Sequence, residues 1–124
     1  MPGFVYGEPY TDHNDGEAPS VGLYRALVSA VSDVFNYQSA QYGEKQAIRI
    51  EWTLPHAFDS KGRPYVVNKK YNVKLDAGGR IVIDTRPDTK QSLGRDLQSW
   101  KPVIGNDLSE LVGQACQVLI MHKP

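Results

Sequence analysis

The stretch QAIRIEWTLPHAFDSKGRPYVVNKKYNVKL, residues 46–75, contains two segments in which apolar and polar side chains alternate. In the first segment the apolar side chains are Ile48, Ile50, Trp52 and Leu54. In the second they are Tyr65, Val67, Tyr71, Val73 and Leu75. A period of two is typical of a strand with one face toward a core. The stretch therefore predicts two strands, the first ending at Pro55, joined by the turn-forming residues 59–64.

The flanking sequence predicts further elements in the order strand, strand, strand, helix, strand. Residues 21–35 are apolar and rich in valine, which favours a long, bent strand over the alternative of a helix, and residues 36–44 predict a loop. Residues 80–83 predict a short strand, 89–100 a helix with one apolar side, 107–111 a helical turn and 115–122 a last strand. The fold expected is mainly β with one or two short helices.

Composition sets the size and surroundings of the protein. The chain has 124 residues, with 14 Lys and Arg against 14 Asp and Glu, which suits one globular domain. Residues 1–20 are rich in Gly, Pro and carboxylates, so we expect a flexible acidic arm over 1–20 and a folded domain over 21–124. The longest uncharged run is 111–121, too short for a membrane span. With one cysteine and no secretory signal, the cytoplasm is the expected compartment.

The sequence offers no motif for catalysis. The histidines His13, His56 and His122 lack the spacing of a metal site, and no glycine-rich segment matches a phosphate-binding loop. Cys116 lies among apolar strand residues, where a thiol has low reactivity. We therefore expect a protein that is not an enzyme and that needs no cofactor.

Positive charge is concentrated in the middle of the chain. Residues 45–74 hold seven Lys and Arg against two carboxylates, whereas residues 1–20 hold four carboxylates and no Lys or Arg. On the outward side of the 65–75 strand, Lys70, Asn72 and Lys74 follow at intervals of about 6.6 Å, twice the strand rise, which is comparable with the spacing of phosphates in an extended single strand. A polyanionic partner is one interpretation, and a solvated strand face is the alternative.

Three segments carry a resemblance to a known family: Trp52-Thr53-Leu54-Pro55, Lys69-Lys70-Tyr71, and Arg95-Asp96-Leu97 to Trp100. In this order, over residues 20–122, the chain resembles small bacteriophage replication-module proteins that bind single-stranded DNA with an OB-like fold. The resemblance implies a small OB-like barrel and single-stranded DNA as the ligand. It also implies other replication or recombination proteins as partners and a bacterial host cell as the location.

The chain departs from the family at its C-terminal end. The family continues past the cysteine-containing strand into a further strand, whereas this sequence ends at Lys123-Pro124. An OB barrel needs five strands, so we expect a barrel that lacks its last strand. The sequence leaves several ways to fill the gap: the 80–83 segment, the N-terminal arm, a second subunit in a homo-oligomer, or no strand at all in a shortened form.

A binder of single-stranded DNA needs cations for phosphates and exposed rings for bases. The nucleic-acid-binding residues predicted on this basis are Tyr37, Tyr42, Arg49, Lys61, Arg63, Lys69, Lys70, Tyr71, Asn72 and Lys74. Binding is expected to show no strong sequence preference, because stacking accepts every base. The main alternative is a protein-interaction module that pairs through an open sheet edge.

Overall fold

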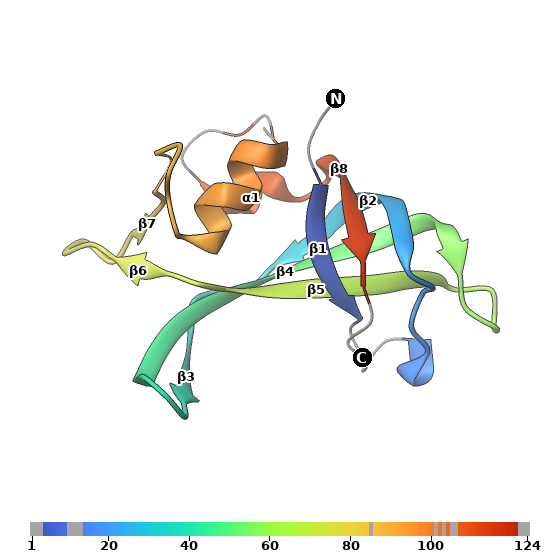
Figure 1. Ribbon diagram of the computed structural model, residues 1–124, viewed down its shortest axis with the longest axis horizontal. Coiled ribbons are helices and arrows are strands. Elements are labelled where there is room, and N and C mark those ends of the chain that lie inside the picture. The colour runs from blue at the N-terminus through green and yellow to red at the C-terminus, as the bar shows by residue number, and fades with distance from the viewer. Residues whose placement is uncertain are drawn as a thin grey trace.

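The computed structural model describes residues 4–9, 14–84, 86–100, 102, 104 and 107–121. These residues form a mainly β structure with one α-helix, α1 (Ser92–Trp100), which covers one side of the strands (Figure 1). The strands are β1 (Phe4–Pro9), β2 (Gly22–Val31), β3 (Phe35–Ser39), β4 (Gly43–Phe58), β5 (Pro64–Asn72), β6 (Lys74–Leu75), β7 (Ile81–Val82) and β8 (Ala115–Ile120). Two short 3-10 helices are η1 (Asn14–Gly16) and η2 (Leu108–Leu111).

The alternating stretch forms the antiparallel hairpin of β4 and β5, as predicted, and this hairpin lies at the centre of the molecule. Its antiparallel register runs from Ala47 opposite Asn72 to Leu54 opposite Tyr65. The inward side chains of both strands are at most 1% exposed: Ile48, Ile50, Trp52, Leu54, Val67 and Tyr71. The end expected at Pro55 is wrong, because β4 continues to Phe58. The register shifts between Leu54 and Phe58, so the proline lies where the regular ladder is interrupted.

Residues 21–39 form two strands rather than one strand and a loop. Strand β2 pairs with β8 over Gly22–Leu27 and with β4 over Leu27–Val31, and a register shift between Val28 and Ala30 lets it bend from one partner to the other. The chain then turns at 32–34. The prediction of a loop over 36–44 is wrong. Strand β3 pairs with β4 from Phe35 opposite Ala47 to Ser39 opposite Gly43.

The structure places β1 and η1 within residues 1–20, the range for which the sequence predicted a flexible arm. Strand β1 lies between β8, to which it is parallel, and β5, to which it is antiparallel. Strand β1 thus fills the gap that the sequence led us to expect in the barrel. Strand β7 pairs only with β6 among the described strands. Composition gave no signal for β1, because its place depends on backbone hydrogen bonds to two existing strands and not on an apolar periodicity.

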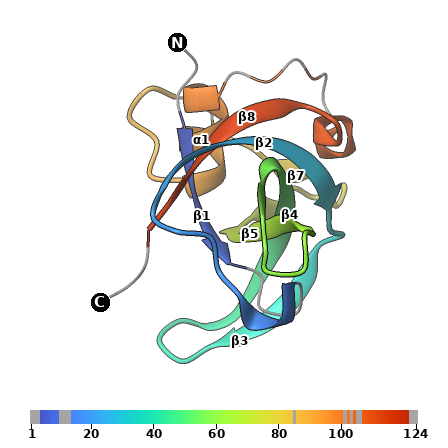
Figure 2. The same cartoon turned by 90° about the vertical axis from the view of Figure 1, so that its right-hand side faces the viewer.

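The pairings make an OB-like, partly open barrel. They run from β2 through β8, β1, β5 and β4 and return to β2, with β3 attached outside. Figure 2 shows β2 and β8 arching over the ends of β4 and β5. Among the described residues, two pairs join β1 to β5, Glu8 with Asn68 and Pro9 with Val67, so the described part of this side is only partly joined. Helix α1 contacts both strands there.

Helix α1 is fixed to the barrel by its own polar side chains. Asp96 accepts hydrogen bonds from the Lys69 ammonium and the Tyr71 hydroxyl, both at 2.6 Å, and the Trp100 indole donates to the Ala115 carbonyl at 2.8 Å. Two of the three segments that carry the family resemblance therefore contact each other. They form a joint between helix and sheet.

Candidate nucleic-acid interface

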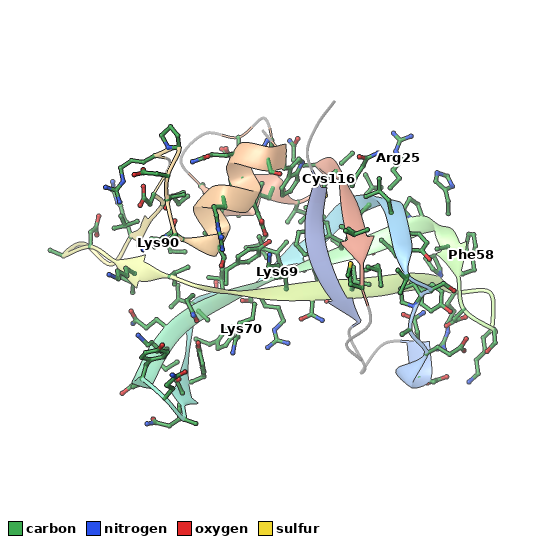
Figure 3. The ribbon with its side chains drawn as sticks, viewed as in Figure 1. Arg25, Phe58, Lys69, Lys70, Lys90 and Cys116 are labelled. Atoms are coloured by element: carbon green, nitrogen blue, oxygen red, sulfur yellow. The ribbon has the colours of Figure 1, made fainter. Side chains whose placement is uncertain are left out.

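Aromatic and polar side chains of strands β3, β4 and β5 lie together on the outside of the barrel. Tyr37 lies opposite Lys45, and Arg49 lies opposite Lys70. Residues paired directly across a sheet share a face. We call this set the basic-aromatic face: Phe35, Tyr37, Lys45, Arg49, Glu51, Asn68, Lys70 and Asn72. The face lies on the side of β5 away from helix α1, and Figure 3 shows Lys70 and Lys69 on opposite sides of that strand.

The turn between β2 and β3 places the aromatic strand beside the basic one. The Ser32 amide donates to the Arg49 carbonyl at 2.9 Å, and the Arg49 amide donates to the Ser32 hydroxyl at 2.8 Å. The Ser32 side chain therefore takes the place of a backbone partner for β4 at the point where β2 separates from β4. This keeps β3 attached to β4, so that Phe35 and Tyr37 lie next to the cations.

Cations and rings on the face contact one another. The Lys70 ammonium lies 3.8 Å from the centre of the Tyr37 ring, and the Arg49 guanidinium lies 5.8 Å from that of Phe35. The two ring centres are 6.4 Å apart. The Tyr37 hydroxyl is hydrogen-bonded to the Asn72 amide oxygen, and Arg49 donates to the Asn68 amide oxygen at 3.3 Å. These contacts orient the rings and cations without neutralising any charge.

The face has an excess of positive charge, because Lys45, Arg49 and Lys70 outnumber the carboxylate of Glu51. Within the part of the chain that the structure describes, none of Lys45, Arg49 and Lys70 is ion-paired with a carboxylate. Lys70 is exposed and Lys45 and Arg49 are half-buried. Surface cations without carboxylate partners attract a polyanion even when the whole molecule is neutral. The predicted residues Tyr37, Arg49, Lys70 and Asn72 are thus brought together on one surface.

The structure does not place the predicted Lys61 and Arg63 on this face. They lie in the turn at the far end of the β4–β5 hairpin, the end marked by Phe58 in Figure 3. Both contact the Asp15 carboxylate, Lys61 at 2.6 Å and Arg63 at 2.9 Å. Hydrogen bonds from Lys61 and then Arg63 lower the pKa of Asp15 below its ordinary value. The acidic arm therefore neutralises this end of the basic segment.

Two further side chains fix the arm to the same turn. The Asn14 amide donates to the Asp59 carboxylate at 2.8 Å, and Glu17 accepts from the Ser60 amide at 3.0 Å. Burial of Asp59 opposes its ionisation, but hydrogen bonds from Asn14 and from the Arg63 and Lys61 backbone amides outweigh it and lower its pKa to about 2. Asp59 is thus a structural anion at neutral pH.

Lys69 and Tyr71 are also not part of the face. Both point to the interior side of β5, where they share the Asp96 carboxylate at 2.6 Å. Tyr71 is 1% exposed, and burial, with the Asp96 charge as a second cause, raises its pKa above the ordinary value. Because the Tyr71 ring is buried, it cannot stack with a base. These two residues serve the joint between helix and sheet.

The remaining predicted residues border the face. Tyr42 lies in the β3–β4 turn, is 69% exposed, and has the Lys45 ammonium 5.1 Å from its ring centre. Lys74 begins β6, just beyond Asn72, and is exposed. Sequence reasoning missed Phe35 and Lys45. The two-residue spacing of Phe35 and Tyr37 is a signal that both lie on one side of a strand. It was overlooked because residues 36–44 were assigned to a loop.

Groups capable of other chemistry are few. Burial raises the pKa of the Cys116 thiol to about 12, so it stays protonated at neutral pH. In the described ranges, no three His, Cys, Asp or Glu side chains are grouped as metal ligands. No described helix has the length and apolar character to cross a membrane.

Comparison with known protein families, curated proteins and solved structures finds no match for this chain.

Proposed function

We propose that this protein binds single-stranded DNA on the basic-aromatic face, without strong sequence preference, as a component of a bacteriophage replication or recombination module. The observation that carries the proposal is the combination, on one outward surface, of the rings of Phe35 and Tyr37 with Lys45, Arg49 and Lys70. None of these three cations is ion-paired with a described carboxylate. OB-folds bind oligonucleotides on the face of their second and third strands and on adjoining loops. The basic-aromatic face likewise lies on two paired strands of the barrel, β4 and β5, and on the adjoining β3.

The energies of the contacts support an exchange at Tyr37. A lysine over an exposed ring is worth about 0.5–1 kcal/mol, whereas a stacked base contributes roughly 1–3 kcal/mol. A base can therefore displace the Lys70 ammonium from the Tyr37 ring, and the freed ammonium can then contact a phosphate. The lysine holds the ring in place before the ligand arrives.

Fluorescence anisotropy with single- and double-stranded oligonucleotides tests this function. We expect binding to the single strand and at least tenfold weaker binding to the duplex, because paired bases cannot stack on the rings. Reversing the charges with Arg49→Glu and Lys70→Glu should abolish binding at moderate salt. Arg25→Glu with Arg95→Glu, two exposed changes on β2 and α1, is the charge-matched control. Equal loss in both variants, or equal affinity for duplex and single strand, contradicts the assignment of the face.

A second candidate function is a protein-interaction module. The observation that favours it is the outer edge of β3, which has no strand partner among the described residues. Such an edge can accept a strand from another protein. This function predicts that Phe35→Ala and Arg49→Glu leave partner binding intact, whereas a proline at Asn36 or Gln38 removes it, with no affinity for oligonucleotides in either case.

A further inference from the structure

A polar groove adjoins the basic-aromatic face where β5 ends. It has a volume of about 1440 Å³ and lies between the β3–β4 hairpin, residues 72–75, and residues 82–84, 86, 88 and 90–92, which lead into helix α1. Typical small-molecule sites measure about 300–1,000 Å³. The groove is therefore larger than a typical small-molecule site.

The groove and the face are continuous. Lys45 and Asn72 belong to the face and also line the groove. The Val73 amide donates to the Gln46 carbonyl at 3.0 Å, and beyond this bond β5 leaves β4 and leads to Lys74. A strand that crosses Tyr37 and Lys70 thus reaches the groove without crossing another element. Figure 1 shows β6 and β7 extending from this end of β5.

The groove has the chemistry that a nucleic-acid strand needs. Lys74 and Lys90 are exposed, and neither has an ion-pair partner within the described ranges. Apolar side chains also line it, among them Val82, which is 47% exposed, and Ile83. Bases can contact these apolar groups while the lysines contact phosphates.

The carboxylates of the groove limit the path of the strand. Arg86 neutralises Asp84 through two contacts, Nε to Oδ1 at 3.0 Å and Nη2 to Oδ2 at 2.8 Å. Glu44 and Asp88 also line the groove, and neither is paired with a Lys or Arg within the described part of the chain. They repel phosphates from their own positions, so the backbone of a bound strand must follow Lys74 and Lys90.

We infer that single-stranded DNA continues from the basic-aromatic face into this groove, where Lys74 and Lys90 bind its phosphates. The inference rests on the proposed function and extends it: the protein has a short site with aromatic stacking and a longer site that adds electrostatic contacts. Lys90 lies near the start of α1, at the end of the molecule opposite Arg25 (Figure 3).

Titrations of oligo-dT of about 4 and about 12 nucleotides test the inference, since one OB-fold covers about 4–16 nucleotides. The double variant Lys74→Ala and Lys90→Ala should bind the short oligonucleotide like the parent, because that ligand gains most from the rings. For the long one, the log–log salt slope should be smaller by about 1.4, at about 0.7 per phosphate contact. The charge-matched control is Arg25→Ala with Lys61→Ala, and melting temperatures check folding.

The outcomes separate the two proposals. If the groove variant and the control bind the long oligonucleotide with the same salt slope, while Arg49→Glu with Lys70→Glu still abolishes binding, the groove is not part of the path and the face remains the site. If the face variant also binds both lengths like the parent, the proposed function itself fails.

Discussion

At the scale of single residues, position along a strand decides between a binding role and a structural one. Lys69 and Lys70 are adjacent in sequence, yet Lys69 is ion-paired with Asp96 at 2.6 Å and Lys70 lies over Tyr37 at 3.8 Å. Successive side chains of a strand point to opposite faces. One residue of displacement therefore turns a candidate phosphate contact into part of the joint between helix and sheet.

Tyr37 tests the stacking role of the face. We expect Tyr37→Ala to weaken binding of single-stranded oligo-dT by about 5- to 150-fold, because one stacked base is worth roughly 1–3 kcal/mol. Tyr37→Phe keeps the ring and removes only its hydrogen bond to Asn72, so it should bind within about threefold of the parent. Anisotropy titration measures both. A phenylalanine variant as weak as the alanine variant would assign the effect to the hydroxyl.

Gly94 tests the packing of helix α1. Helix propensity predicts that Gly94→Ala stabilises the helix by about 1 kcal/mol. A Cβ at this position would lie 2.0 Å from the Asp84 carbonyl oxygen, which real atoms cannot occupy. We therefore expect the opposite sign, a loss of about 1–3 kcal/mol in the free energy of unfolding. Denaturant unfolding measures it, with the exposed Arg95→Ala as the control.

At the scale of elements, the N-terminal segment has two structural roles that its composition does not indicate: it adds a strand, and it binds the β4–β5 turn. Strand β1 completes the pairing between β8 and β5. Residues 14–17 then bind the β4–β5 turn through Asn14, Asp15 and Glu17. Because the arm carries carboxylates to Lys61 and Arg63, the free positive charge remains at the other end of the hairpin.

The docking of the arm should depend on pH. The pKa of Asp59 is about 2 in the folded protein and 3.8 ordinarily, so its ionised form favours folding. Its contribution is complete above pH about 4 and is lost as the pH falls through about 2. We expect the melting temperature of the parent to fall more steeply between pH 5 and 2 than that of Asp59→Asn. The exposed Asp33→Asn, as control, should follow the parent.

At the scale of the whole molecule, zero net charge and a local positive surface predict a modest salt dependence. Three unpaired cations on the face, at about 0.7 per phosphate, give a log–log slope of about −2 for a short oligonucleotide. The 14 carboxylates match the 14 cations in number, so little long-range steering is expected. Titration over a tenfold range of salt measures the slope, and a flat response would show that the cations do not contact phosphates.

The alternating stretch predicted the hairpin at the centre of the barrel and, with it, the outward positions of Arg49, Lys70 and Asn72. Periodicity is a local property, because each side chain of a strand takes its face from the residue before it. The helix with Leu93 and Trp100 on its apolar side was predicted for the same reason, and it is observed as α1. Tyr37 and Tyr42 were identified as exposed rings, although β3, which places Tyr37 on the face, was expected to be a loop.

The sequence by itself therefore determined the mainly β fold, the two central strands, the helix and the alternation that sends lysines outward. Only the tertiary structure decided which cations remain free. Asp15, which pairs with Lys61 and Arg63, and Asp96, which pairs with Lys69, lie 27 to 48 residues away from these cations along the chain, although Arg63 also pairs with the nearby Asp59. The tertiary structure also decided that the arm forms a strand. Ion pairs and strand pairing over such separations depend on how the chain closes on itself, and no local pattern encodes that closure.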